Sequence, residues 1–154
     1  MDEQTIVQMG GAQRALYESQ LQRAREEGAG RNGLSQKSMT ALFAALRKAA
    51  NHPCLLRSHY TDDDLESIAA VARAAGAFGE RATMRMIREE IGTYSDFQIH
   101  QLCADLPPLR ARVLPAATLR ASAKMAALAT LLPELADAGH RVLIFSQVRC
   151  HPLP

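Results

Sequence analysis

The 154-residue chain has no tryptophan, few aromatic residues (5%) and only three cysteines. Cys54, Cys103 and Cys150 are an odd number, and their spacing matches neither a disulfide framework nor a C-x-x-C metal pair, which favours a reducing compartment. The polar, acidic residues 1–4 are unlike a signal peptide, and no apolar run is long enough to cross a membrane. These absences predict a soluble intracellular chain with no membrane partner.

The sequence also lacks the G-x-x-x-x-G-K-[ST] loop, whose backbone N–H groups cradle a phosphate. The glycine-rich stretch 28–33 is not followed by Lys-Ser or Lys-Thr. His52 and Cys54 flank a proline, and Cys150 and His151 lie far along the chain, so these residues make a poor chelate. No nucleophile-elbow pattern accompanies the five histidines. We therefore predict no catalytic, cofactor-binding or metal-binding residue in this chain.

Alanine is the most conspicuous presence, with 27 residues, and it predicts a helix-rich protein with a thin core. The net charge of +2 is unevenly distributed. Residues 1–60 carry +3, residues 61–105 carry −5 and residues 106–154 carry +4. Because the cations are split between two ends, we expect any binding of the isolated chain to DNA to be weak, non-specific and salt-dependent.

Apolar spacing and capping residues predict six helices. Ser35, Thr61, Ser95 and Ser122 are the expected N-caps, and Pro53 and Gly139 are expected to end the second and last helices. The predicted helices are residues 4–27 (with a start near 12 because Gly10-Gly11 interrupts the pattern), 35–52, 61–75, 80–91, 95–103 and 122–138. The expected buried faces are Met39, Leu42, Phe43 and Leu46 on the second helix and Met125, Leu128, Leu132 and Leu135 on the last.

The stretch between the fifth and last helices contains three prolines, so residues 105–120 are predicted to be neither helix nor central strand. The run 141–146 is apolar on both faces, as in a buried strand of a parallel sheet. Ser146 and Gln147 follow the carboxyl end of this strand, where open α/β sheets bind ligands. The chain supplies no second strand, so residues 141–147 are expected to be an isolated extended segment that packs against the last helix.

Three ordered segments resemble the Swi/Snf-related (Snf-two type) ATP-dependent chromatin-remodelling helicases. They are Leu46-Arg-Lys-Ala-Ala-Asn-His-Pro53, Ser122-Ala-Lys-Met-Ala-Ala-Leu128 and Gly139-His-Arg-Val-Leu-Ile-Phe-Ser-Gln147. The segment 9–21, with Gln13 and Tyr17, resembles a fourth family pattern, M-s-x-x-Q-x-x-x-Y. Segments 56–60 and 93–103 are similar to the DEAD/H-box-containing subgroup. Ala123 stands where the family usually has glycine, and residues 148–154 depart from the family's next helix.

The resemblance implies a mainly α chain with one β-strand, a fragment of a two-lobed RecA-like α/β motor. Residues 1–60 would end lobe 1, and residues 61–105 would form an acidic helical protrusion. Residues 106–120 would be a proline-containing linker, and residues 121–154 would be the first helix and strand of a truncated lobe 2.

The resemblance also implies which residues face which partner. Ser146 and Gln147 would face DNA, and the lobe-junction motif would consist of Arg47, Lys48, Asn51, His52, Pro53 and Lys124. The intact parent would bind ATP and magnesium, hydrolyse ATP, and act on DNA or nucleosomes in the nucleus. This chain alone would be inactive and would need the missing lobes as partners. The alternative is a non-enzymatic helical module that binds another protein through the acidic helix at 61–66 or through alanine-rich faces.

Overall fold

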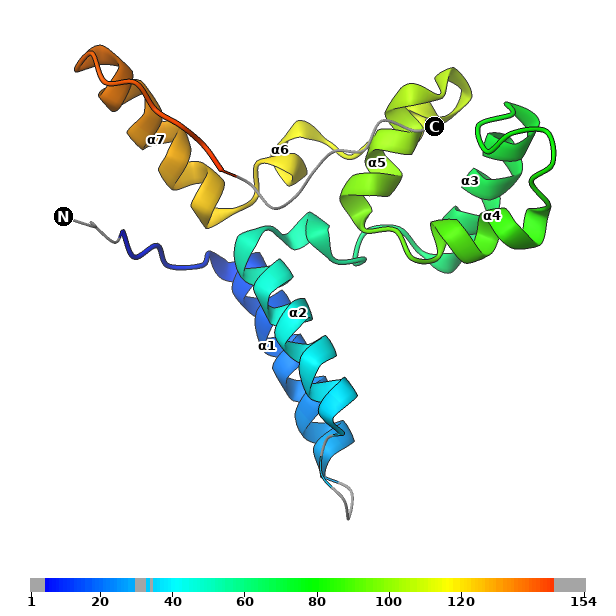
Figure 1. The fold of residues 1–154 in the computed structure, drawn as a ribbon, viewed down its shortest axis with the longest axis horizontal. Helices are drawn as coiled ribbons and strands as arrows, with labels where there is room; N and C mark the ends of the chain where they lie inside the picture. The colour runs from blue at the N-terminus through cyan, green and yellow to red at the C-terminus, as the bar shows by residue number, and fades with distance from the viewer. Residues whose placement is uncertain (1–4, 30–32, 34, 146–154) are drawn as a thin grey trace. The chain divides into compact units, whose positions relative to one another are not determined.

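The computed structural model describes residues 5–29, 33 and 35–145, and this part of the chain is helical with no β-strand (Figure 1). No helix among these residues is long and apolar enough to span a membrane. The elements are α1 (Gly11–Gly28), α2 (Gln36–Asn51), the 3₁₀ turn η1 (Pro53–Leu55), α3 (Asp62–Ala74), α4 (Met84–Ile91), α5 (Asp96–Asp105), the 3₁₀ helix η2 (Pro107–Arg112), α6 (Ala116–Leu119) and α7 (Ala123–Asp137).

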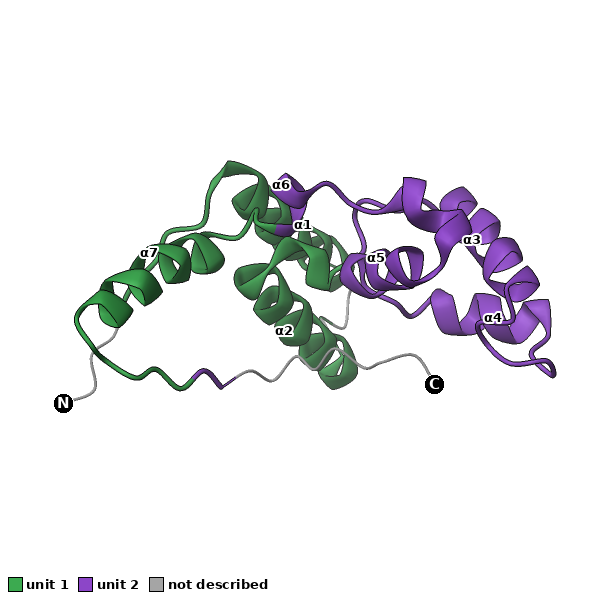
Figure 2. Ribbon diagram, turned by 90° about the horizontal axis from the view of Figure 1, so that it is seen from above, with its two compact units in different colours: residues 1–56, 120–143 green, residues 57–119, 144–154 purple. Residues whose placement is uncertain are grey.

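The chain divides into two compact units (Figure 2). Unit 1 contains residues 1–56 and 120–143, and unit 2 contains residues 57–119 and 144–154. Unit 1 holds α1, α2 and α7, whereas unit 2 holds α3 to α6.

In unit 1, α1 and α2 lie side by side as a helical hairpin (Figure 1). The predicted cap of α2 is confirmed, because the Ser35 hydroxyl accepts a hydrogen bond from the Ser38 N–H at 3.1 Å. The predicted end is confirmed as well: His52, the residue before Pro53, is extended with φ −161° and ψ 134°. The fully buried face expected on α2 is wrong, since Met39 and Phe43 are 40% and 63% exposed. α1 is a single helix, and it covers only part of the four-residue apolar stripe.

The core lies in unit 2, where the largest fully buried side chains are aliphatic: Ile68, Ile87, Ile91, Ile99, Leu102 and Leu109. The predicted caps at Thr61 and Ser95 are confirmed. Both are capping boxes, in which the cap and a side chain three residues on together accept two backbone N–H groups at the helix start. Helix α4 begins four residues later than predicted, because Thr83 supplies its cap and the chain turns at Gly79 with φ +81°.

Residues 105–120 contain more helix than the sequence predicts. The 3₁₀ helix η2 starts at Pro107, and the single turn α6 follows Pro115. A proline at the start of a helical turn costs no hydrogen bond, since the first N–H groups have no intrahelical acceptor. Leu109 in η2 is 1% exposed, so its burial anchors this segment in the core of unit 2.

Helix α7 starts at the predicted cap and ends at the predicted Gly139, which has φ +76°. Its expected buried face is wrong: no residue of α7 is fully buried, and Met125 is 45% exposed.

The one predicted strand is absent from the described residues 141–145, and the expectation that this segment has no ladder partner is confirmed there. Its expected packing against α7 is wrong, because Leu143 and Phe145 are 83% and 91% exposed. The physical reason is that no other strand among the described residues can complete a hydrogen-bonded ladder or cover the apolar faces.

Candidate functional site

The carboxyl end of α2 is satisfied by side chains rather than by further helix. A helix leaves its last carbonyl groups without intrahelical donors. The Gln13 side-chain amide of α1 donates to the carbonyl oxygens of Ala49 (2.9 Å) and Ala50 (3.0 Å). The Asn51 amide donates to the Arg47 carbonyl at 2.9 Å. Gln13 is only 3% exposed, so its side chain joins α1 firmly to the end of α2.

The amino end of α7 meets the same place. The Ser122 hydroxyl donates to the Asn51 carbonyl oxygen at 2.7 Å and accepts the Met125 N–H at 3.4 Å as the N-cap of α7. The Ala123 N–H donates to the Gln13 side-chain oxygen at 3.0 Å. We call Gln13, Asn51, Ser122, Ala123 and Lys124 the helix junction.

The charges at the helix junction are favourable. The Lys124 ammonium donates to the Asn51 side-chain oxygen at 3.0 Å. This places a cation at the carboxyl end of α2, where the helix dipole is negative. Lys48 adds a second cation to the last turn of α2. The helix junction therefore combines directional hydrogen bonds with cations placed beside the negative end of the α2 dipole.

The structure brings together some of the residues assigned to the lobe-junction motif. Asn51 and Lys124 contact each other directly. Arg47 and Lys48 are exposed on the last turn of α2, and the Arg47 carbonyl is held by Asn51. His52 and Pro53 lie next to the junction: the His52 Nδ1 accepts the Cys54 N–H at 3.0 Å, and Pro53 is buried at the start of η1.

Two of the assigned residues, Ser146 and Gln147, lie outside the described residues. Three residues of the junction were not assigned to the site from the sequence, namely Gln13, Ser122 and Ala123. Gln13 carries a signal that could have identified it, a polar residue in the first turn of a helix that starts without a capping side chain.

A second polar contact holds the start of unit 2. Asp96 in the first turn of α5 is completely buried, and its carboxylate accepts the N–H groups of Ser58 (2.8 Å), His59 (3.0 Å) and Tyr60 (3.3 Å). The Ser58 hydroxyl adds a fourth donor at 3.2 Å. Charge-assisted hydrogen bonds of this kind are about twice as strong as neutral ones. Asp96 thus fixes residues 58–60, which follow the lobe-junction motif in the sequence.

Burial in unit 2 favours the protonated form of two titratable side chains, Cys103 and Tyr60. Burial raises the pKa of the Cys103 thiol to about 11, so the thiol is protonated near neutral pH. Burial likewise raises the pKa of Tyr60, whose hydroxyl donates to the Arg112 carbonyl at 2.8 Å. Among residues 5–29, 33 and 35–145, no three His, Cys, Asp or Glu side chains come together as a metal site would require.

Comparison with solved structures first shows which class of fold the chain has. No family model matches the chain. The structure is similar to the crystal structure of the C-terminal part of the Fun30 ATPase domain, with a TM-score of 0.71 and 23% sequence identity. The match covers 88% of this chain and 48% of that chain. The fold is therefore that of a helical part of an ATPase domain.

Curated relatives then define the family. Protein CHROMATIN REMODELING 19 of Arabidopsis thaliana is 39% identical over 115 residues, which cover 74% of this chain and 15% of that protein. The ATP-dependent helicase fft2 of Schizosaccharomyces pombe is 35% identical over 113 residues, which cover 72% and 9%. A DEAD/H-box-containing SWI/SNF-related regulator of chromatin of Danio rerio is 30% identical over 147 residues, which cover 96% and 15%.

The chain is homologous to the SWI/SNF-related ATP-dependent helicases, as its ordered segments indicate. It spans between 9% and 15% of the length of these three relatives.

Proposed function

We propose that this segment connects the two lobes of an ATP-dependent chromatin-remodelling motor. The observation that supports the proposal is the helix junction. It unites residues from segments 9–21, 46–53 and 122–128, three of the four that resemble the family, through hydrogen bonds that span up to 110 positions of sequence. A joint between two motor lobes needs such contacts, because coupling between sites travels through packed and hydrogen-bonded elements.

In this proposal residues 1–60 complete lobe 1, residues 61–105 form the helical protrusion, residues 106–120 are the linker and residues 121–154 begin lobe 2. Asn51 and Lys124 hold the two lobes in register. Ser146 and Gln147 contact the DNA backbone, and the motor acts on nucleosomes in the nucleus. Other parts of the parent bind ATP and magnesium, since this sequence contains no phosphate-binding loop.

The first test of this proposal is to read the coding sequence on either side of the segment. An in-frame upstream G-x-x-x-x-G-K-T and a downstream arginine-bearing motif are expected. If both are missing, the alternative of a non-enzymatic helical interaction module takes its place. The second test measures phosphate release by the isolated chain with ATP, magnesium and DNA, and release above a protein-free blank would contradict the proposal that it is inactive alone.

The third test changes the junction in the intact parent. Asn51→Ala and Lys124→Ala are expected to lower the DNA-stimulated kcat for ATP hydrolysis. The KM for ATP is expected to stay the same, because this sequence contains no phosphate-binding loop for the junction to hold. Arg81→Ala is the matched control, since Arg81 is exposed and belongs to unit 2. Equal effects of the junction and control variants would contradict the assigned role.

A further inference from the structure

Helix α2 exposes an apolar stripe that its own hairpin leaves uncovered. Met39 and Phe43 lie one helical turn apart and are 40% and 63% exposed. Leu42 and Leu46, on the neighbouring row of the helix, are only partly buried. Exposed large side chains in a continuous row mark interaction surfaces more often than isolated ones do.

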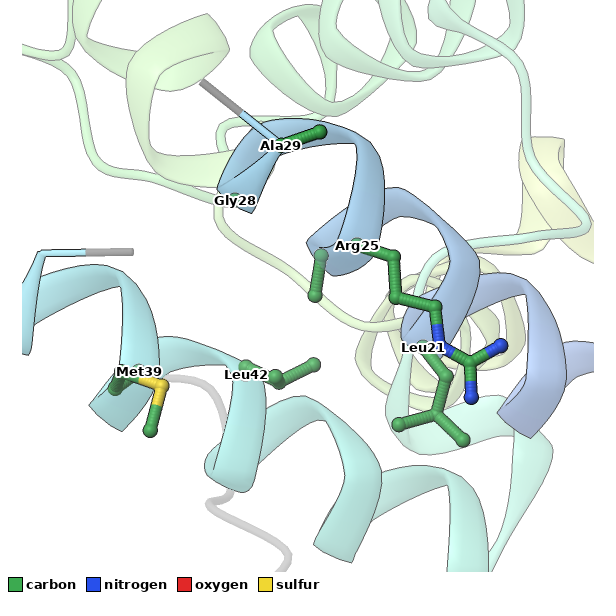
Figure 3. A pocket seen from close by; sticks show the side chains of 7 residues that line it. Leu21, Arg25, Gly28, Ala29, Met39 and Leu42 are labelled. Atoms are coloured by element: carbon green, nitrogen blue, oxygen red, sulfur yellow. The ribbon is translucent and has the colours of Figure 1, made fainter. Parts of the chain in front are cut away.

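The stripe continues into an open hollow between α1 and α2. Figure 3 shows Leu21 and Arg25 of α1 and Met39 and Leu42 of α2 around this hollow, which has a volume of about 520 Å³. Met39 belongs to both features, so the hollow and the stripe form one surface. A groove between two helices matches the ridge of side chains on a third helix.

The charges around this surface have one sign on α2. The helix carries Lys37, Arg47 and Lys48 and no carboxylate. Arg25 adds a cation at the hollow, although α1 as a whole is balanced, with Glu18, Glu26 and Glu27 beside its three arginines. None of the ion pairs between described residues involves Arg25, Lys37 or Lys48. A partner with carboxylates beside its apolar face therefore gains charge complementarity.

We propose that α2 and the adjoining hollow, which we call the α2 surface, bind an acidic amphipathic helix that lies outside this chain. Its apolar side chains pack on Met39 and Phe43, and its carboxylates face the cations of α2. A second copy of this chain fits less well, because a two-fold contact through α2 would oppose three cations with three cations. A flat lipid surface fits less well than a helix, because it cannot fill the hollow between α1 and α2.

The test uses the full 154-residue chain and a designed 18-residue helical peptide with leucines along one face and glutamates on both sides. Binding is measured by calorimetry and by NMR shifts in α2. We expect a Kd of about 10–100 µM, as for a small transient interface. A matched peptide with lysine in place of glutamate is expected to bind at least about tenfold more weakly.

Two variants locate the binding site. Met39→Gln and Phe43→Ser are each expected to weaken binding about tenfold, because each removes a large apolar contact. Met86→Gln is the control, since Met86 is also an exposed methionine (53%) but lies on α4. Circular dichroism of each variant verifies that the helices are retained, and Met39→Gln replaces Phe43→Ser if the latter unfolds.

Several results would overturn the proposal. They are the absence of binding at millimolar peptide, equal binding of the two peptides, and equal weakening by Met86→Gln. Phe43-dependent binding to phosphatidylserine vesicles without peptide binding would assign the surface to membranes instead. Dimerisation in sedimentation experiments that Phe43→Ser abolishes would assign it to a second copy.

Discussion

The helix junction predicts a specific effect of replacing Gln13 by leucine. The Gln13→Leu variant keeps a similar volume but loses both amide donors and the acceptor oxygen. Three backbone groups lose their partner: the carbonyls of Ala49 and Ala50 and the N–H of Ala123. The last turn of α2 and the first turn of α7 are therefore expected to open more often.

The size of the effect follows from burial. Ala50 is exposed, so water can replace the lost donor at its carbonyl. Ala49 is completely buried and Ala123 is half-buried, and each unsatisfied buried group costs about 1–3 kcal/mol. The buried leucine returns about 1 kcal/mol through its extra apolar surface. The net loss is about 2 kcal/mol, or about 30-fold in the local opening equilibrium.

Hydrogen exchange of the backbone amides measures this opening directly. The amides near Asn51 and Ala123 should lose protection by about 30-fold, while those of α3 in unit 2 should be unchanged. Gln22→Leu is the matched control, because Gln22 is an exposed residue of α1 whose side-chain amide donates to the Glu26 carboxylate at 2.9 Å, one turn further along the same helix. A change below about threefold at Ala123, or an equal change in the control, would refute the reasoning.

Three further predictions concern unit 2. Asp96→Asn should lower the thermal midpoint of unit 2 by several degrees, because the buried carboxylate accepts charge-assisted hydrogen bonds worth about 1.5–3 kcal/mol. Asp105→Asn is the control and should have little effect, since Asp105 is exposed. Hydrogen bonds from Thr61 hold the pKa of the Asp64 carboxyl below its usual 3.8 in the folded chain. The stability that Asp64 contributes is therefore complete above pH 3.8 and is lost as the pH falls through the lower folded pKa. In an acid titration of stability, Asp64→Asn should lack this decrease. Burial raises the pKa of the Cys103 thiol from 9.0 to about 11, so the free energy of unfolding should fall as the pH rises through this range. Alkylation of Cys103 at pH 8, followed by peptide mapping, should be slower in the folded than in the denatured chain.

The helix starts were predictable because each depends on residues close in sequence. The caps Ser35, Thr61, Ser95 and Ser122 all bond to an N–H three positions further on. The helix end at Pro53 is equally local, since proline constrains the residue before it. Such signals depend on side-chain and backbone geometry within one turn, which the sequence specifies by itself.

Burial was less predictable because it depends on partners elsewhere in the chain. The pattern at Met39 and Phe43 is the same in a covered and an uncovered helix, and only the position of α1 decides which apolar side chains are buried. The apolar run at 141–145 has strand character, but a strand needs a neighbouring strand for its N–H and C=O groups. The described part of the chain provides none.

The sequence by itself determined the helical class, the caps and the order of segments that identifies the family. The tertiary structure decided which of those segments touch. Gln13 bonds to residues 36, 37 and 110 positions away, and Asp96 bonds to residues 36 to 38 positions away. A glutamine or aspartate has the same donors and acceptors at any position in the sequence, so its partner is set only when packing brings distant backbone groups within about 3 Å of it.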